Sequence, residues 1–357
     1  MVQKKDPYQK GRSWKKFKKH KLAVVASLVL VGLYLASVCA EFIAPYSVFG
    51  EDRVSSYQPP NHIYWFDEGH FAPYIYNYST GFDVNFNRVF ESKKDKKYYL
   101  RFFNHGDKYN FLGLFETDIH LFGVDKGGRF FLMGADARGR DLFSRILFGS
   151  RVSLSIGVVG SFITFFLGML IGAMAGYYGG WVDGFIMRIC EVLMMVPGFY
   201  LLLALRAALP AELPSFHIYM GIVIILSFID WAGLARVIRG MVLAEAKKEY
   251  VLGAQSIGVS SMAVIMRHIL PNTLSYVIVS LTVGIPGYIL GESALSLLGL
   301  GIVDPDVSWG NMLSEAMAIS HIQYHPWILI PGFFIFITVM MFNLMGDGLR
   351  DAFDPRS

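Results

Sequence analysis

The most regular feature of this chain is a series of apolar blocks separated by polar segments. Each block is near or above the length of about 20 residues that a helix needs to cross the hydrocarbon core of a bilayer. A helix satisfies its own backbone hydrogen bonds in that environment. The pattern therefore predicts six transmembrane helices, at residues 22–44, 152–175, 185–209, 218–235, 273–300 and 327–345.

A long polar segment separates the first apolar block from the second. Residues 45–143 are rich in Tyr, Phe, Asn, Asp and Gly, and residues 98–103 form a strand-like patch. A segment with so many aromatic residues is expected to fold and not to stay disordered. We therefore predict an all-α polytopic membrane protein with six transmembrane helices and a small, β-rich extracytoplasmic insertion.

The charges of the short segments predict the orientation of the spans. Residues 1–21 hold nine Lys or Arg against one Asp, and such residues collect on the cytoplasmic side. Six crossings then place the C-terminus in the cytoplasm as well. The loop between the fourth and fifth blocks contains five Lys or Arg, whereas residues 301–326 contain none, in agreement with this topology.

These boundaries give the predicted organisation of the chain. We read the first apolar block as a retained anchor, because it is longer than the apolar region of a signal peptide. The parts are a cytoplasmic basic N-terminus at 1–21, transmembrane helix 1 at 22–44, an extracytoplasmic insertion at 45–143, a core with transmembrane helices 2–6 at 144–350 that includes a cytoplasmic loop at 240–271, and a cytoplasmic C-terminal tail at 351–357.

The composition is typical of a membrane protein and argues against nucleic-acid binding. Hydrophobic residues make up 54% of the chain and charged residues 17%, as is typical of a membrane protein. The net charge is +4, and the one dense basic run, at 15–21, precedes a span, where a juxtamembrane anchor is expected. We therefore expect the lipid bilayer as a partner and no nucleic acid.

The sequence also lacks the patterns of common catalytic and metal sites. Cys39 and Cys190 each lie in an apolar stretch, without CxxC or His-rich spacing, so we predict no disulfide framework, metal or cofactor. There is no GxxxxGK[ST] loop to hold ATP phosphates and no HExxH motif. These absences predict a protein that is not an enzyme.

The cytoplasmic loop before the fifth block carries the strongest functional signal. Its pattern predicts a short helix over 244–257, a break at Gly258 and a second short helix that ends at Pro271. A helical pair too polar to insert in the bilayer is suited to docking in a groove of a cytosolic partner. The predicted apolar anchors are Tyr250, Val251 and Ile257, and the small residues that allow close approach include Gly253 and Ala254.

This loop resembles the EAA motif of ABC importer permeases, in which Glu-Ala-Ala, three residues, Gly and nine residues precede Ile-x-Leu-Pro. Leu252-Gly253-Ala254 occupies the first three positions, Gly258 matches the glycine, and Leu270-Pro271 matches the end. Leu252 replaces the first residue of the motif and His268 replaces its Ile. The resemblance therefore carries over the shape of the motif but no polar role for its Glu.

Four further segments resemble the dipeptide and oligopeptide branch of this family, and in particular its second permease, the C subunit. They are MGADARGRDLFSR at 133–145, GYYGGWVD at 176–183, SWGNML at 308–313 and NLMGDGLRDAFDPR at 343–356. The insertion is longer than in a typical member. It resembles that of a subgroup with an enlarged external loop.

The resemblance implies a type I ABC importer permease fold, in a subunit that forms half of the translocation pathway and does not hydrolyse ATP. Its implied partners are a second permease subunit, two cytosolic ATP-binding subunits and an extracytoplasmic substrate-binding protein, in a bacterial cytoplasmic (inner) membrane. Peptides are the implied cargo, although relatives that carry nickel chelates or other small solutes leave this open. The implied ATPase-coupling residues are Tyr250, Val251, Gly253, Ala254, Ile257, Gly258, His268, Leu270 and Pro271.

Ionisable residues inside the predicted spans are candidates for a translocation path, because charge at membrane depth is costly and usually functional. The candidates are Glu191, Asp230 and Glu292. Glu191 has the alternative of pairing with Arg188 three residues earlier, and Glu292 has the alternative of satisfying helix contacts.

Two further features concern the shape of the spans. Gly168, Gly172 and Gly176 follow each other at four-residue spacing, which predicts a face for close helix packing. Pro197 and Pro286 are expected to kink the third and fifth spans.

Two other classes of protein fit this sequence less well. An ion-gradient-driven secondary transporter is expected to contain inverted repeats and broken midplane helices, and the two halves of this chain show no convincing repeat. A membrane-anchored receptor needs a single anchor, whereas six spans are predicted here. A secondary transporter also has no use for a docking loop before the fifth span.

Overall fold

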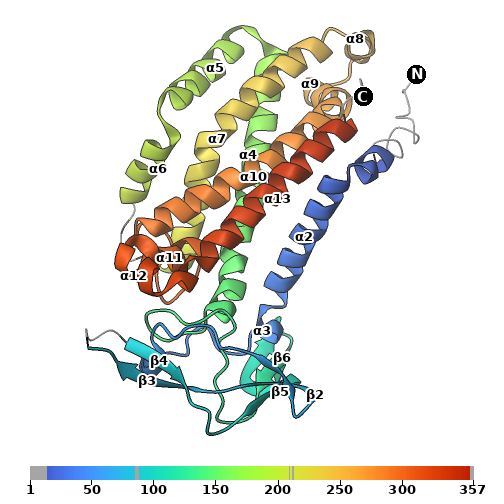
Figure 1. The fold of residues 1–357 in the computed structure, drawn as a ribbon. Helices are drawn as coiled ribbons and strands as arrows, with labels where there is room; N and C mark the ends of the chain where they lie inside the picture. Colours follow the sequence, from blue (N-terminus) through green and yellow to red (C-terminus); the bar gives the residue numbers. More distant parts are fainter. Residues whose placement is uncertain (1–13, 85–87, 209, 211–212, 354–357) are drawn as a thin grey trace. The chain divides into compact units, whose positions relative to one another are not determined.

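The computed structural model describes residues 14–84, 88–208, 210 and 213–353. Most of these residues are helical (Figure 1). The helices are α2 (Lys21–Val38), α3 (Ala40–Ile43), α4 (Leu142–Tyr178), α5 (Gly180–Met195), α6 (Gly198–Ala207), α7 (Ser215–Glu245), α8 (Glu249–Ser256), α9 (Ser261–Val264), α10 (Leu270–Leu297), α11 (Trp309–Leu313), α12 (Ile319–Tyr324) and α13 (Ile330–Phe353). Short 3₁₀ or π turns are η1 (Arg53–Ser55), η2 (Ile265–Ile269), η3 (Ser314–Met317) and η4 (Pro326–Leu329), and the strands are β1 (Tyr64–Asp67), β2 (His70–Ile75), β3 (Tyr78–Phe82), β4 (Arg88–Ser92), β5 (Tyr98–Phe111) and β6 (Phe115–Val124).

Five described helices are long and apolar enough to cross a membrane: Lys21–Val38, Leu142–Tyr178, Ser215–Glu245, Ser261–Leu297 and Pro326–Phe353. The pair α5 and α6 forms a sixth candidate, bent by 87° at its break. The predicted all-α polytopic fold with a small β-rich insertion is confirmed.

The third predicted span is bent at Pro197, as expected, and the bend divides it into two helices. Helix α5 ends at Met195, and Pro197 caps the start of α6. Proline has no N–H to bond to the preceding turn, and its ring collides with that turn. The expected end of this span, at residue 209, lies outside the described residues. By contrast, α10 contains Pro286 and continues past it.

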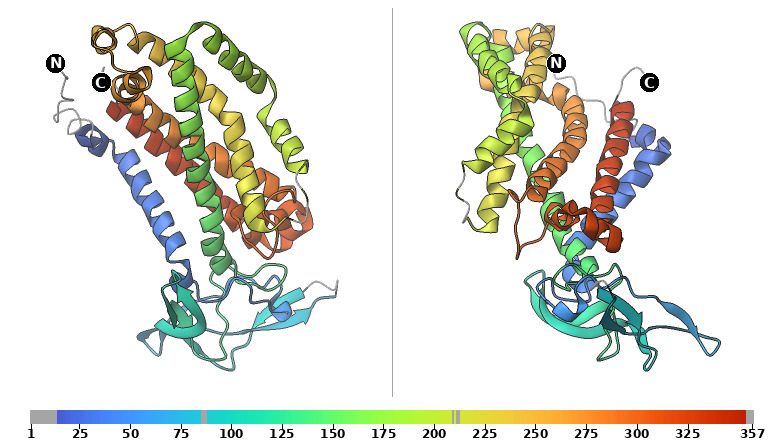
Figure 2. Two further views of the ribbon diagram at one scale, coloured as in Figure 1. Left: turned by 180° about the vertical axis from the view of Figure 1, so that it is seen from behind. Right: turned by 60° about the vertical axis from the view of Figure 1, so that its left-hand side comes forward.

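The chain forms two compact units, and the first comprises 1–30, 155–295 and 337–357. Within it, α4 approaches α7 at the three glycines of the predicted stripe (Figures 1 and 2). A Cβ on Gly168 would lie 2.8 Å from Leu234 Cβ, and one on Gly176 would lie 2.7 Å from the Arg239 carbonyl. A Cβ on Gly172 would overlap the backbone of Ala235. The two backbones come this close only because these side chains are absent.

The second unit comprises 31–154 and 296–336. Its main sheet has the strand order β1-β2-β5-β6, with all neighbours antiparallel, and β3 and β4 form a separate hairpin. The buried residues Ile75, Val124 and Phe130 pack together as the core of this part. The unit also holds residues 296–336, so the loop before the last span is packed with the start of α4.

Trp309 joins these two segments of the second unit. Its side chain is fully buried, and its ring N–H donates to the Ile146 carbonyl at 3.0 Å. Its backbone N–H donates to Ser153 Oγ at 3.0 Å. Ser308 caps α11 in a capping box with Asn311, which satisfies the free N–H groups of this short helix. The segment at 308–313 is therefore a fixed structural element.

Candidate functional site

The loop before the fifth span contains an independent short helix, α8. The predicted helix over 244–257 is wrong at its start, because α7 runs to Glu245 and α8 begins only at Glu249. Its predicted end is close, since Ile257 is the residue that caps α8. The break at Gly258 is present, with φ +81°, a left-handed backbone that favours glycine.

The end of α8 has the bonding pattern of a Schellman motif. The N–H of Gly258 donates to the Gln255 carbonyl at 3.0 Å, and that of Val259 donates to Ala254 at 3.2 Å. Val259 also packs on the cluster that contains Val251 and Ala254. Such an apolar contact usually accompanies this helix end, so the direction of the chain after α8 is fixed by both hydrogen bonds and packing.

The two faces of α8 have different roles. Val251 and Ala254 are buried against Ile238, Val242 and Ile265 of the protein's own core. The interpretation of Val251 as an anchor for a partner, and of Ala254 as room for its approach, is therefore wrong in this structure. These two residues bind α8 to its own helices because they lie three positions apart, on one face.

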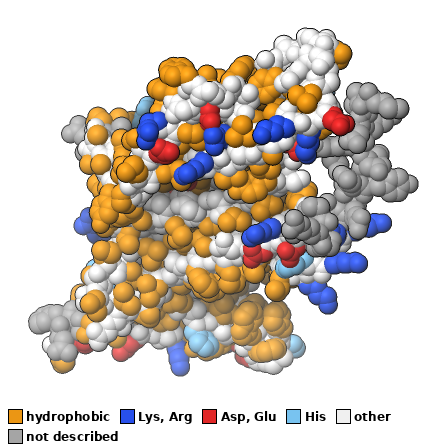
Figure 3. Space-filling model, turned by 90° about the horizontal axis from the view of Figure 1, so that it is seen from above, with side chains coloured by type: hydrophobic (Ala, Val, Ile, Leu, Met, Phe, Trp, Pro, Cys, Tyr) orange, Lys and Arg blue, Asp and Glu red, His pale blue; other side chains and the backbone are white. Residues whose placement is uncertain are grey.

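The other apolar residues of α8 and its C-cap residue form an open face. Tyr250 is 41% exposed, Leu252 48% and Ile257 81%. Gly253 also has free space around the position of a Cβ. Figure 3 is seen from the side on which α8 lies in Figure 1, and it shows apolar side chains together with Lys, Arg, Asp and Glu side chains.

Tyr250 is held by polar contacts from both sides of α8. Its hydroxyl donates to a carboxylate oxygen of Glu245 at the end of α7, and it accepts from the amide of Asn272 at 2.8 Å. Lys248 also pairs with Glu245, at 2.5 Å. Burial, together with the hydrogen bond to Glu245, raises the pKa of Tyr250 to about 12. The hydroxyl therefore stays protonated and continues to donate across the physiological pH range.

The second predicted short helix, ended by Pro271, is also wrong. Helix α9, the π turn η2 and α10 follow without a break, and Pro271 is the second residue of α10. In the π turn, the Leu270 N–H bonds to the Ile265 carbonyl, five residues back. This shifted pattern lets a helix pass a residue that lacks an N–H. Leu270 is buried and His268 is partly buried.

The candidate path residues do not form one cluster. Glu191 is exposed on α5 and pairs with Arg188 at 3.1 Å. Glu292 is fully buried in α10, next to the Ser293 hydroxyl at 3.5 Å. Asp230 lies on α7 and forms a side-chain hydrogen bond with Tyr288. The structure thus separates Glu191 from the other two.

A polar cluster around Tyr288 was missed in the sequence. The Tyr288 hydroxyl shares a hydrogen bond with Thr164 Oγ1 at 2.5 Å, and the Ser227 hydroxyl donates to the Gly160 carbonyl at 3.0 Å. Tyr288 precedes Glu292 by four residues, so both lie on the same side of α10. Hydropathy gave no signal, since Tyr, Thr and Ser are common in apolar helices.

A second site, in the other unit, is a buried network of charges. Arg140 donates to Asp136 at 2.6 Å and to Asp304 at 3.0 Å. Arg145 reaches the same two carboxylates, at 3.4 and 3.3 Å. Arg140, Arg145 and Asp136 are almost completely buried. Because burying a charge without a partner is very costly, these four groups hold residues 136–145 and the loop around Asp304 together.

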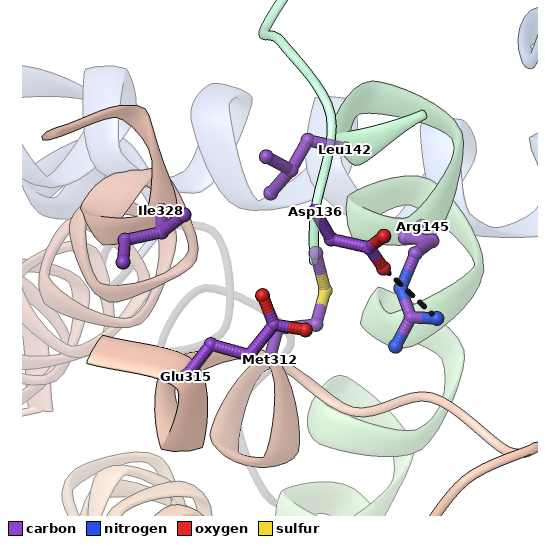
Figure 4. Close-up of a pocket in the computed structure, with 6 residues that line it drawn as sticks. All are labelled: Asp136, Leu142, Arg145, Met312, Glu315 and Ile328. Carbon is purple, nitrogen blue, oxygen red and sulfur yellow. Dashed lines mark ion pairs between the residues drawn. The ribbon is translucent and has the colours of Figure 1, made fainter. Parts of the chain in front are cut away.

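Glu315 completes one side of this network. A small pocket is lined by Asp136, Leu142, Arg145, Met312, Glu315 and Ile328 (Figure 4). Glu315 accepts from the Ala137 N–H at 3.1 Å. Burial, followed by the charge of Asp136, raises the pKa of Glu315. For Asp304, burial opposes ionisation, but Arg140, Arg145 and Arg138 outweigh it and lower the pKa.

Asp141 stands beside this network and has a structural task of its own. It accepts from the backbone N–H of Ser144 at 2.8 Å and from its hydroxyl at 2.6 Å. It thereby caps the start of α4, as Asp residues commonly do. Burial raises the pKa of Asp141 to about 7, against the opposing hydrogen bonds from Ser144.

The segment at 133–145 resembles the family in sequence, but the resemblance does not predict its charge network. Its density of Asp and Arg was visible in the sequence, whereas Asp304 is more than 150 residues away. Among the described residues, no group of three or more His, Cys, Asp or Glu side chains is placed to hold a metal ion.

Comparison with protein families gives two matches. A model described as "Binding-protein-dependent transport system inner membrane component" matches residues 168–357. A second, described as "N-terminal TM domain of oligopeptide transport permease C", matches residues 9–60. Together they cover the first span and the part of the chain that contains α8, Asp230 and Tyr288.

Three relatives show how far the similarity extends. The dipeptide transport system permease protein DppC of Bacillus subtilis is 30% identical over 345 residues, which is 96% of this chain and 85% of the relative. The oligopeptide transport system permease protein OppC of Haemophilus influenzae is 42% identical over 65% of this chain and 71% of its own length. The glutathione transport system permease protein GsiD of Escherichia coli is 42% identical over 62% of this chain and 71% of its own length.

Among solved structures, a chain of the MetNI methionine ABC transporter in an inward-facing conformation is similar. It has a TM-score of 0.42 and 15% identity, and the match covers 58% of this chain and 96% of that one. A likeness this distant supports no argument about the site.

Proposed function

We propose that ATP-binding subunits dock on the loop at residues 240–271 of this chain and drive its movement from there. The chain belongs to the family of binding-protein-dependent transport system inner membrane components. As a member of that family the chain is a multi-pass permease subunit of an ABC importer. It works in a transporter complex with ATPase and substrate-binding partners. ATP hydrolysis belongs to those partners.

The observation that carries the coupling proposal is the division of α8 into an anchored and an open face. The buried face, with Val251 and Ala254, attaches α8 to the helix bundle. The open face, with Tyr250, Leu252 and Ile257, is available to a groove on a cytosolic subunit. A partner that grips the open face moves the anchored helices with it. This is how closure of the ATPases on ATP reaches the spans in alternating access.

The remaining residues of the coupling proposal act by shaping this element. Gly258 ends α8, and Gly253 leaves space on its open side. Leu270 and Pro271 open α10 just after the π turn, and His268 is partly exposed within that turn. In this proposal Leu270 anchors the element in the core, and His268 belongs to the surface that meets the partner.

The assembly that fits this proposal contains one further permease subunit and two ATP-binding subunits, each gripping the coupling loop of one permease. An extracytoplasmic binding protein delivers the substrate. Both termini and the loop at 240–271 then face the cytoplasm, and the insertion at 45–143 faces outward, in a bacterial inner membrane. The excess of Lys and Arg in residues 1–21 supports this orientation.

For the translocation path we propose the side of α10 that holds Tyr288 and Glu292, together with Asp230 on α7. The Tyr288 cluster supports this, because polar groups at membrane depth are usually kept for function. Glu191 is the weakest of the three carboxylates, since it already pairs with Arg188.

For the cargo we propose small peptides. Support comes from relatives named for dipeptide, oligopeptide and glutathione transport, because glutathione is itself a tripeptide. These cargoes share a peptide backbone and charged ends. No specific observation favours nickel chelates or an ion-gradient-driven mechanism.

Cysteine cross-linking tests the coupling surface. In a background with Cys39 and Cys190 replaced by Ser, Ile257→Cys should cross-link to a cysteine in the groove of the ATP-binding subunit. The matched control Val251→Cys should not, because Val251 is buried. Absence of a cross-link at position 257 in an assembled complex that transports would contradict the proposed docking face.

Uptake into proteoliposomes tests the cargo and the energy source. Transport of a labelled dipeptide or tripeptide should require ATP on the side of the ATP-binding subunits, together with the binding protein. It should persist when a protonophore collapses the proton gradient. Uptake that follows the gradient and ignores ATP would contradict the importer, whereas ATP-driven uptake of another solute in place of peptides would contradict only the cargo.

A further inference from the structure

The tip of the β5–β6 hairpin exposes apolar side chains where a turn is normally polar. The strands join through Leu112, Gly113 and Leu114, whereas such turns favour Asn, Asp and Gly. Leu112 has φ +50°, an unfavourable backbone for a leucine. Leu114 is 77% exposed and Phe115 57%. Exposing these apolar side chains to water is unfavourable, so the turn is better suited to an apolar environment.

The position of this hairpin follows from the end of the first span. Val31, Leu35 and Val38 are all exposed on α2, and their spacing places them on one side of the helix. Phe42 of α3, four residues further, continues that side. Its ring lies 6.2 Å from the ring of Phe103 on β5, which is 64% exposed. The outward-facing stripe of the span thus runs on into the hairpin.

Polar contacts also attach the hairpin to the end of α3. His120 of β6 bonds through Nδ1 to the Ala44 carbonyl at 2.5 Å and through Nε2 to the Asp107 carbonyl at 3.0 Å. Tyr109, two residues further along β5, has Glu41 as an electrostatic neighbour. This stretch of the hairpin therefore lies beside residues 41–44 of α3 and its end. Figure 2 shows the β5–β6 hairpin beside the end of α3.

The side chains at the tip favour a lipid environment over a protein interface. Residues 111–115 contain no charged or hydrogen-bonding side chain. Charges begin behind them, with Lys108 paired to Glu116 at 3.3 Å and His105 paired to Asp118 at 3.0 Å. A protein interface would usually combine apolar contacts with hydrogen bonds. An apolar end backed by charged pairs instead matches an element seated at the boundary of headgroups and acyl chains.

We propose that the β5–β6 hairpin is a membrane-dipping element, in which Leu112, Leu114 and Phe115 enter the leaflet next to the first span and Phe103 lies at its surface. The hairpin then supports the insertion on the bilayer at a second point, beside its covalent attachments to α3 and α4. This holds for either orientation of the chain in the membrane.

Spin labelling of the complete transporter in nanodiscs of phosphatidylcholine and phosphatidylglycerol tests the proposal. Cys39 and Cys190 are replaced by Ser, and a nitroxide is attached at Leu114→Cys or, as a control, at Lys94→Cys in the exposed turn before β5. At position 114, collisions with oxygen, which concentrates in lipid, should exceed those with a water-soluble nickel chelate several-fold. At position 94 the order should be reversed.

A second pair of variants separates lipid contact from folding. With a label at Phe115→Cys, the change Leu112→Asn plus Leu114→Asn should raise nickel-chelate collisions several-fold. It should not unfold the hairpin, because Asn suits this turn. Collisions at position 114 dominated by the nickel chelate would place the tip in water. Low collisions with both reagents would place it against another subunit. Either result overturns the proposal.

Discussion

The N–H of Val259 donates to the carbonyl of Ala254 at 3.2 Å, across a left-handed Gly258. This bond closes α8 and sets the direction in which the chain enters α9. A Cβ at Gly258 would meet no atom within 4 Å. Any cost of substitution here therefore comes from the backbone and not from a collision.

We expect Gly258→Val to impair coupling. A β-branched residue in the left-handed region costs about 1–2 kcal/mol, so the end of α8 should loosen while the spans still insert. ATP-driven uptake should fall, with the amount of purified complex unchanged. Gly258→Asn is the matched control, because Asn tolerates this backbone. Equal uptake by both variants and the wild type would argue against a coupling role for this turn.

Removing one member of the buried charge network should be strongly destabilising. Arg140→Gln leaves Asp136 and Asp304 without their best partner, and breaking such a buried pair typically costs about 3–5 kcal/mol. Arg138→Gln, at a guanidinium that is half exposed, should cost less than about 1 kcal/mol. Thermal unfolding of the two purified variants gives the comparison. Similar midpoints would show that the network contributes little.

Asp141 predicts a specific pH dependence of stability. Its pKa is raised by burial to about 7 in the folded chain, against about 3.9 when unfolded. The folded state therefore holds this proton more tightly. The resulting stabilisation is complete below about pH 4 and is lost as the pH rises through about 7.

Asp141→Asn isolates this effect, because Asn still caps a helix and does not titrate. Unfolding midpoints of wild type and variant should diverge as the pH is raised from 5 to 8, with the wild type losing stability relative to the variant. Parallel curves over this range would contradict the assigned protonation.

Two glycine-to-alanine changes should have opposite signs. In Gly172→Ala the new methyl overlaps the Ala235 backbone, so α4 and α7 must separate at a cost of about 1–3 kcal/mol. In Gly184→Ala on α5 the methyl meets nothing within 4 Å, and alanine should stabilise the helix by about 0.5–1 kcal/mol. Thermal midpoints that move in the same direction would contradict the close packing at Gly172.

The sequence predicted those features that depend on local pattern. Apolar blocks of bilayer length gave the spans, because each reports its environment without reference to the rest of the chain. The break at Gly258 was also visible, since glycine is the usual residue after a helix end.

Features that depend on a partner far along the chain were not predictable in this way. The sequence predicts that Val251 and Ala254 face outward, whereas in the structure Ile238 and Val242 cover them. Tyr288 becomes a candidate site residue only through its hydrogen bonds with Thr164 and Asp230, which the sequence does not reveal. Pro271 was read as a terminator because the π turn that accommodates it leaves no clear mark in sequence.

That π turn has a mechanical consequence. Since the helix is unbroken from Ser261 to Leu297, at about 1.5 Å per residue it is a single rod roughly 55 Å long. If α8 couples to the ATP-binding subunits as proposed, a push near Gly258 acts on one end of this continuous helix, and Glu292 lies near its other end.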